Sequence, residues 1–450
     1  MEHKQESVFE RVNQAIKTSV SIKLLSIGFL IAILLIPNNM IQSLISERKV
    51  NQFEAEREVS EKWGAPVALT GPILTIPFER VHQGTEGPLV TKHYAHFLPT
   101  ELNTKGDLTP STRKRGIYEV VVYNTQLKVK GSFDEIEFEH LRANAEQVQW
   151  EEAFVSIGIP DMAGIQSDIN LEFGEATYRM GPGIPVKDVI PSGVNARVSL
   201  DESTGKIDYA FDLNINGTKV LLFNPIGKST HIQLNSTWPH PSFTGQFLPD
   251  QYEVTEGGFS AEWSVFDLNR NYPQSWVDDA HEIETAEFGV NLYQPVDNYQ
   301  RNTRSAKYAV LILFLTFITF FFVEILNKKK IHPIQYILIG LALTVFYTLL
   351  LSLSEQIGFN AAYFTAAAII IAMVTLYTRS ILGSSRLALI LLAFFSMIYA
   401  FIFVILQMED QSLLVGSFGL VIVLALCMYL SRKVDWYNLK TKEKVTHAST

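Results

Sequence analysis

Residues 306–326 read AKYAVLILFLTFITFFFVEIL, and this stretch decides the fold class. Between Lys307 and Glu324 it contains no charged residue. A helix of 21 residues is about 32 Å long, which is enough to cross a hydrocarbon core about 30 Å thick. The stretch therefore predicts a membrane-spanning helix.

Five other apolar runs have a similar length and composition. The first is residues 24–45, and no small-x-small cleavage pattern follows it, so we expect an uncleaved anchor helix. Asn38 and Asn39 in this run must lie near the interface or face other helices. The other four runs follow the opening stretch through short connections and complete a five-helix bundle over residues 306–430: 334–353, 361–377, 387–406 and 413–430. The sequence thus predicts six spans.

The chain between the first two spans has the composition of a soluble domain. Residues 46–305 hold 22 Lys and Arg against 37 Asp and Glu. Such an acidic surface does not favour nucleic acid as a partner, because phosphates bind Lys and Arg. The charged residues 47–63 have partial helical spacing and are expected to continue the first helix.

Most of this domain has the pattern of β-strands. Clear strand patterns cover residues 117–123, 126–133, 206–215 and 259–266, and turn residues such as Asn216-Gly217 separate them. Many strands with few helix signals predict a mainly-β, sandwich-like domain. One short helix is expected around residues 138–146.

The basic residues near the span ends predict the orientation. Lys and Arg cluster in the amphipathic segment 1–23, in the loops after the second and fourth spans, and in the tail 431–450, whereas the alternate loops carry only acids. Both termini are therefore expected in the cytoplasm and residues 46–305 outside it. Arg301, Arg304 and Lys307 are the exception, since they lie on the outer side.

The sequence contains no motif that predicts catalysis or a cofactor. His93 and His96 have a spacing that suits metal ligands on a helix, but their segment has a strand pattern, in which they would face opposite sides. Cys427 is the single cysteine, which excludes an internal disulfide. We therefore expect no catalytic residues, no metal and no cofactor.

Two sites in the outer domain are candidates for interaction. Trp238, His240 and Phe243 lie in the densest cluster of aromatic residues and prolines. The cluster is either a binding ridge for a peptide or lipid, or a rigid corner fixed by its prolines. Arg270 either pairs with an acid of the fold or binds a ligand.

Glu324 and Glu355 are the candidate intramembrane polar residues. Each lies near one end of its span, where an ionised carboxylate is tolerable. A carboxylate at the midplane would cost about 2.5–3.5 kcal/mol and would indicate transport. No span has one, which counts against an ion-coupled transporter.

Several blocks in order along the chain resemble the CreD family of inner-membrane cell envelope integrity proteins. They include Gly71-Pro72-Ile73-Leu74-Thr75, Arg115-Gly116-Ile117-Tyr118, Trp238-Pro239-His240-Pro241, His332-Pro333 and Ser352-Leu353-Ser354-Glu355. The resemblance implies a bacterial inner-membrane protein with a periplasmic domain, linked to envelope stress, colicin tolerance and β-lactam response. It brings no catalytic mechanism and hence no catalytic residues.

Three functions are consistent with these observations. The leading hypothesis is a non-enzymatic envelope protein whose outer domain binds a periplasmic protein or lipid. A membrane insertase resembling YidC has a similar architecture, but no span here holds the buried Arg that such a groove requires. An envelope-modifying enzyme would need a cleft that gathers Arg270, His240 and acids. The sequence does not indicate the oligomeric state.

Overall fold

The structure is a computed structural model that describes residues 20–432, except 85, 86, 135, 137, 139–146, 203, 282, 284, 285, 295–297, 328, 330 and 409–411. Most of the amphipathic segment 1–23, the short helix expected around residues 138–146 and nearly all of the tail 431–450 lie outside the described residues. The chain forms two compact units: a helical unit, Met1–Asn51 with Val296–Thr450, and a β domain, Gln52–Pro295.

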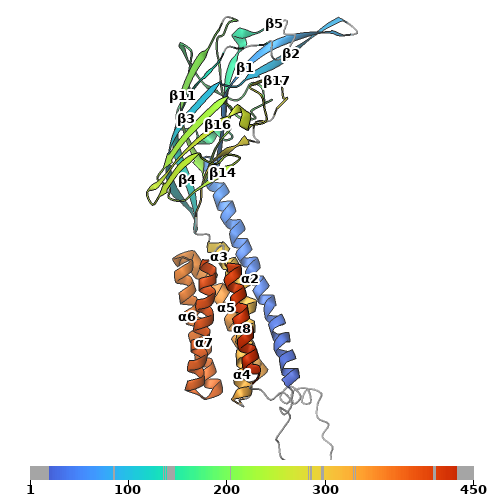
Figure 1. Ribbon diagram of the computed structural model, residues 1–450, viewed down its shortest axis with the longest axis vertical. Helices are drawn as coiled ribbons and strands as arrows, with labels where there is room; N and C mark the ends of the chain where they lie inside the picture. The colour runs from blue at the N-terminus through green and yellow to red at the C-terminus, as the bar shows by residue number, and fades with distance from the viewer. Residues whose placement is uncertain are drawn as a thin grey trace, which may run out of the picture. The chain divides into compact units, whose positions relative to one another are not determined.

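The helical unit contains the six apolar helices that the sequence predicts (Figure 1). Their bounds, together with those of a short helix α3, are α2 Val20–Trp63, α3 Asn298–Lys307, α4 Ala309–Leu326, α5 Pro333–Ile357, α6 Phe359–Leu382, α7 Ser385–Gln407 and α8 Ser412–Ser431. Hydrocarbon offers no partner to backbone groups, and a continuous helix satisfies them internally.

Helix α2 is longer than the anchor span expected from hydropathy. It runs without a break through Pro37 and the charged residues 47–63, so the expected continuation of the first helix is confirmed. Its residues to Asn51 belong to the helical unit, and those from Gln52 belong to the β domain. Asn38 is only 2% exposed and faces other helices of the unit.

A short polar helix precedes the second apolar span. α3 is separated from α4 at Tyr308, which stands between the two helices. Its buried residues include Tyr299, Asn302 and Ser305, so its polar side chains face the helical unit. Hydropathy alone did not predict α3 because most of its residues are polar.

The β domain consists of two mixed sheets, which confirms the mainly-β prediction. The strands are β1 Val67–Gly84, β2 Gly87–Phe97, β3 Glu101–Arg115, β4 Tyr118–Phe133, β5 Gln147–Val148, β6 Phe154–Gly158, β7 Asn170–Phe173, β8 Ala176–Arg179, β9 Gly181–Pro182, β10 Gly193–Arg197, β11 Ile207–Thr218, β12 Val220–Phe223, β13 Ser229–Ser236, β14 Pro241–Gly245, β15 Gln251–Thr255, β16 Gly258–Phe266, β17 Ser275–Val277 and β18 Phe288–Leu292.

The first sheet has ten strands and the second has eight. The first has the order β14-β18-β12-β1-β6-β10-β9, with β2 and β5 also pairing with β1, and β17 pairing with β2. The second has the order β15-β16-β13-β3-β4-β11-β7-β8. The β1–β12 and β3–β13 pairs are parallel. Sequence-distant strands therefore become neighbours in both sheets.

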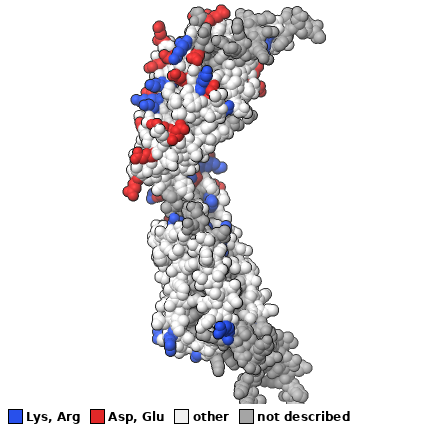
Figure 2. Space-filling model, in the orientation of Figure 1, with Lys and Arg blue, Asp and Glu red and all other residues white. Residues whose placement is uncertain are grey.

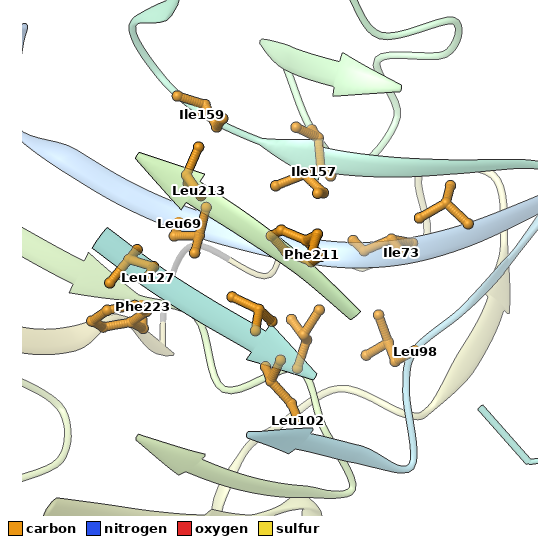
Figure 3. Packing of buried hydrophobic residues seen from close by; sticks show 14 of the residues in the cluster. Leu69, Ile73, Leu98, Leu102, Leu127, Ile157, Ile159, Phe211, Leu213 and Phe223 are labelled. Atoms are coloured by element: carbon orange, nitrogen blue, oxygen red, sulfur yellow. The ribbon is translucent and has the colours of Figure 1, made fainter. Parts of the chain in front are cut away.

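The core of the domain lies between the two sheets (Figure 3). Leu69, Ile73 and Ile157 come from the first sheet, while Leu127 and Phe211 come from the second. In β3 the buried and exposed residues alternate, as expected for a strand with one face on a core. The opposite face of the eight-stranded sheet is accordingly polar.

Candidate functional site

Glu324 is the centre of a polar cluster at one end of the helical unit. The carboxylate lies on α4 and its side chain is only 5% exposed. The ammonium group of Lys23 on α2 forms an ion pair with Oε1. The Tyr336 hydroxyl on α5 donates to Oε2 at 3.1 Å, and the backbone N–H of Ile331 donates to Oε1 at 3.0 Å. One carboxylate thus joins α2, α4 and α5.

Glu355 is the centre of a second cluster, near the C-terminal end of α5. Its Oε1 lies 3.8 Å from Nε of Arg48 on α2 and accepts a hydrogen bond of 3.0 Å from the Tyr299 hydroxyl on α3. A second contact joins α3 and α5: Nδ2 of Asn302 donates to Oγ of Ser354 at 2.8 Å. This cluster joins α2, α3 and α5.

The two clusters bind opposite ends of the apolar part of α2. Lys23 and Arg48 are 25 residues apart, which corresponds to about 38 Å along a helix. A bilayer with its headgroup regions is about 40–45 Å thick. The spacing supports the prediction that Glu324 and Glu355 lie near the two interfaces. The ion pairs with Lys23 and Arg48 make both carboxylates structural partners of the anchor helix.

Between the two clusters the anchor helix packs closely against α5. A Cβ atom at Gly340 would overlap the Leu34 side chain of α2 and would come within 3.0 Å of the Phe317 ring on α4. The absence of a side chain at position 340 therefore allows Leu34 to fit between α4 and α5. Polar contacts at both ends and this close contact in the middle hold α2 in place.

Two of the three basic residues that break the charge rule, Arg304 and Arg301, have partners within the helical unit. Nη2 of Arg304 donates to the backbone oxygen of Met408 at 2.8 Å and to that of Ile405 at 3.4 Å. These carbonyls end α7, where a cation is stabilised by the helix dipole. The Arg301 guanidinium lies 5.9 Å from the centre of the Phe359 ring. Local contacts thus account for positive charge at this end.

The Trp238, His240 and Phe243 cluster has structural partners in the β domain. Nε1 of Trp238 donates to the Tyr293 backbone oxygen at 2.9 Å, and the His240 backbone oxygen accepts from the Tyr293 N–H at 3.1 Å. The Phe243 ring packs edge-on against Trp263, with ring centres 5.7 Å apart. These contacts favour the rigid-corner interpretation of the cluster over a binding ridge.

Arg270 uses backbone carbonyls as its partners. It donates to the carbonyl oxygens of Tyr272 and, at 3.2 Å, of Ile226, and its guanidinium lies 4.2 Å from the centre of the Tyr272 ring. No described carboxylate forms an ion pair with it. Burial lowers the pKa of Arg270 from its ordinary value, although Tyr272 and Asp267 oppose the shift. Arg270 and His240 thus have separate partners among the described residues.

His93 and His96 have different environments, as the strand pattern predicts. Nδ1 of His93 lies 2.7 Å from Oδ2 of Asp278. His96 is 2% exposed and its Nδ1 lies 3.0 Å from the Thr75 hydroxyl. Its Nε2 has no hydrogen-bond partner among the described residues, and Oδ2 of Asp188 is 3.9 Å away. Across the part of the chain that the structure describes, no group of three or more His, Cys, Asp or Glu could hold a metal ion.

Burial shifts the protonation of this region toward neutral forms. It lowers the pKa of His96 from 6.5 to about 4, with the Asp278 charge opposing the shift. Burial also raises the pKa of Asp188, and the charges of Asp278 and Asp279 add to that shift. Because the desolvation of its charged form dominates, His96 is neutral at ordinary pH.

Sequence reasoning did not identify the partners of the two intramembrane carboxylates. Lys23 counted only as a charge near a span end, and Arg48, Tyr336 and Tyr299 were not considered. A basic residue at each end of an apolar helix was the available signal, but the acid it pairs with lies on another helix.

Six apolar helices, buried charges paired within the bundle and one large two-sheet domain define a multi-pass membrane protein. The family model described as inner membrane protein CreD matches residues 19–437. The chain is also 31% identical over 451 residues to inner membrane protein CreD of Escherichia coli strain K12, and the match covers 96% of this chain and 98% of that protein.

The chain belongs to the CreD family of inner membrane proteins. The resemblance found in the sequence is thereby confirmed, and so is a multi-pass location in the inner membrane.

A single variant and a double variant of Lys23 and Glu324 test the anchor-helix cluster. We expect Glu324→Ala to lower the free energy of unfolding by about 3–5 kcal/mol, because it leaves a buried ammonium group without its partner. The double variant K23M/E324M removes both charges and should recover most of that loss. Thermal and urea unfolding of the purified full chain in detergent measures both changes.

The exposed pair of Arg57 and Glu61 on the same helix is the matched control. Its side chains are 76% and 64% exposed, so Arg57→Ala should change stability by less than about 1 kcal/mol. A loss for K23M/E324M as large as for E324A would contradict the assignment.

The pH dependence of stability tests the environment of His96. Because the folded-state pKa is about 4 and the unfolded value is 6.5, the unfolded chain takes up the proton first as the pH falls. The free energy of unfolding is therefore unaffected by His96 above pH 6.5, where the ring is neutral in both states. It falls by about 3 kcal/mol as the pH is lowered from about 6.5 to 4, because only the unfolded chain readily binds the proton. The free energy of unfolding, measured with urea at pH 7 and pH 4.5, should decrease less between these two pH values for His96→Asn than for the wild type.

His240→Asn is the control for this measurement, since His240 is exposed. It should retain the wild-type pH dependence. An equal change in the free energy of unfolding with pH for H96N and the wild type would show that His96 does not bear this desolvation cost.

Proposed function

We propose that this protein maintains the bacterial cell envelope by binding rather than by catalysis. In this proposal the β domain faces the periplasm and binds a protein or lipid there, and the helical unit anchors it. The proposed physiological role is in envelope stress, including colicin tolerance and the response to β-lactams.

One observation carries the proposal. The carboxylates of Glu324 and Glu355 each have a basic partner on α2 and a tyrosine hydroxyl as hydrogen-bond donor. Both groups therefore hold helices together, and neither is free among the described residues to carry an ion or a substrate. Specific recognition is better assigned to the β domain.

The distribution of charge supports the proposed orientation. On the face that Figure 2 shows, the wall of the helical unit is nearly free of charged side chains, and Lys and Arg appear at its ends. Lys23, Lys329, Arg379, Arg386 and Arg432 flank the span ends that should lie in the cytoplasm. At the other ends, Arg48 and Arg304 have partners within the unit.

Cysteine labelling tests this orientation. In a Cys427→Ser background, Glu256→Cys lies in the exposed turn between β15 and β16, and Ser385→Cys lies at the start of α7. We expect a membrane-impermeant maleimide to label E256C in intact spheroplasts and S385C only after permeabilisation. The reverse pattern would overturn the proposed topology.

Envelope resistance tests the function. A strain of the source bacterium that lacks this protein should become more sensitive to detergent and β-lactam and should change its response to colicins, and the wild-type chain should restore each response. The double variant K23M/E324M should restore them too, because it leaves no unpaired charge at this position. Wild-type resistance of the deletion strain to all three agents would contradict the proposal.

A further inference from the structure

The polar face of the eight-stranded sheet contains a hollow of about 450 Å³. Residues of β3, β4, β11, β13 and β16 line it, and these strands belong to one sheet; Figure 1 labels β3, β4, β11 and β16. Three of the lining residues are Lys105, Lys128 and Lys130, and His231, Asp212 and Glu262 also contribute. The hollow is separate from the two clusters of the helical unit.

The strand register brings the three lysines together. Lys105 on β3 lies directly opposite Lys128 on β4, and Lys130 is two residues further along the same face of β4. Like charges directly opposite each other destabilise a sheet. Asp212 on β11 lies directly opposite Lys128 on its other side and offsets part of this repulsion. An anion over the three ammonium groups would offset the rest.

Several other basic residues of the same domain have acidic partners. Lys92 pairs with Glu152 at 2.7 Å, Lys219 with Glu56 at 2.6 Å, and Arg179 with Asp168 at 2.9 Å. Within the described part of the chain, no carboxylate oxygen forms an ion pair with Lys105, Lys128 or Lys130. What distinguishes these three lysines is that they lie together on one face of the sheet.

The two acids of the hollow lie at opposite ends of one row of side chains. Across the sheet the row runs Glu262, Gln233, Lys105, Lys128 and Asp212. Donors therefore occupy the middle of the row and acceptors its ends. In the next row, the ring nitrogens of His231 lie 3.0 Å from Oγ of Ser229 and 3.1 Å from Oγ of Ser264, which fixes the ring.

We propose that this hollow binds a phosphate-bearing ligand. The phosphate lies over Lys105, Lys128 and Lys130, and hydroxyl or amino groups of the same ligand reach Asp212 and Glu262. Three ammonium groups match the dianionic charge of a phosphate monoester better than the single charge of a carboxylate, and lysine binds phosphate as a point charge. The assignment rests on the proposed function, which places recognition in the β domain.

Phosphate esters reach such a surface as soluble molecules or as lipid headgroups, and the experiment separates the two. The full chain is held in phosphatidylcholine nanodiscs. Calorimetry measures binding of inorganic pyrophosphate and glycerol phosphate, and co-flotation measures binding to vesicles that contain phosphatidic acid. We expect saturable binding in at least one arm, weakened by added salt because the lysines are exposed.

The triple variant K105Q/K128Q/K130Q is the decisive comparison. It should weaken the observed binding by about tenfold or more, because it removes all three charge-assisted contacts. The matched control K114Q/K187Q/K206Q makes the same charge change at three other exposed lysines of the domain, and it should stay within about twofold of the wild type. Melting temperatures no lower than that of the wild type would show that both variants fold.

Two results would overturn the assignment: no binding of any probe by the wild type, or equal binding by the wild type and K105Q/K128Q/K130Q. Binding to vesicles alone identifies a lipid headgroup, and binding of pyrophosphate or glycerol phosphate identifies a free phosphate compound. The resistance of the deletion strain is read independently, so a failure here is distinguishable from a failure of the proposed function.

Discussion

The ion pair between Lys23 and Glu324 is the interaction on which the helical unit depends. The Glu324 side chain is only 5% exposed, so its carboxylate would be costly to bury without a partner. The pair is completed by Tyr336 and the Ile331 N–H, so α2, α4 and α5 meet at one carboxylate. The Arg48–Glu355 pair repeats this arrangement at the far end of the apolar part of α2. The anchor helix is thereby bound to the bundle at two levels.

The β domain solves a different problem, because it must cover the apolar faces of two large sheets. The sheets cover each other, and Leu127 and Phe211 of one lie in the same core as Ile73 and Ile157 of the other (Figure 3). The outer face of the eight-stranded sheet is then free to carry charge. That freedom allows three lysines to lie together at one hollow.

Much of the architecture was predictable from local patterns. The apolar runs predicted six helices because hydropathy depends only on composition along the chain. The polar helix α3 was missed because its buried face contains Tyr299 and Asn302, which no hydropathy pattern marks as buried. The rigid-corner alternative for Trp238 and the separation of His93 from His96 were predictable from proline chemistry and from the alternation of a strand. The expected acid partner of Arg270 was not found among the described residues, since backbone carbonyls of neighbouring loops take its place.

The sequence by itself determined the six spans, the acidic β-rich domain and the membership of the CreD family, because hydropathy, charge and motif order are all properties of the linear chain. Only the tertiary structure decided which charges meet. Lys23 and Glu324 are 301 residues apart, and helix packing makes them neighbours. Lys105 and Lys128 lie on different strands, and only the sheet register places them opposite each other. Partners of this kind depend on distances in space, which no local pattern specifies.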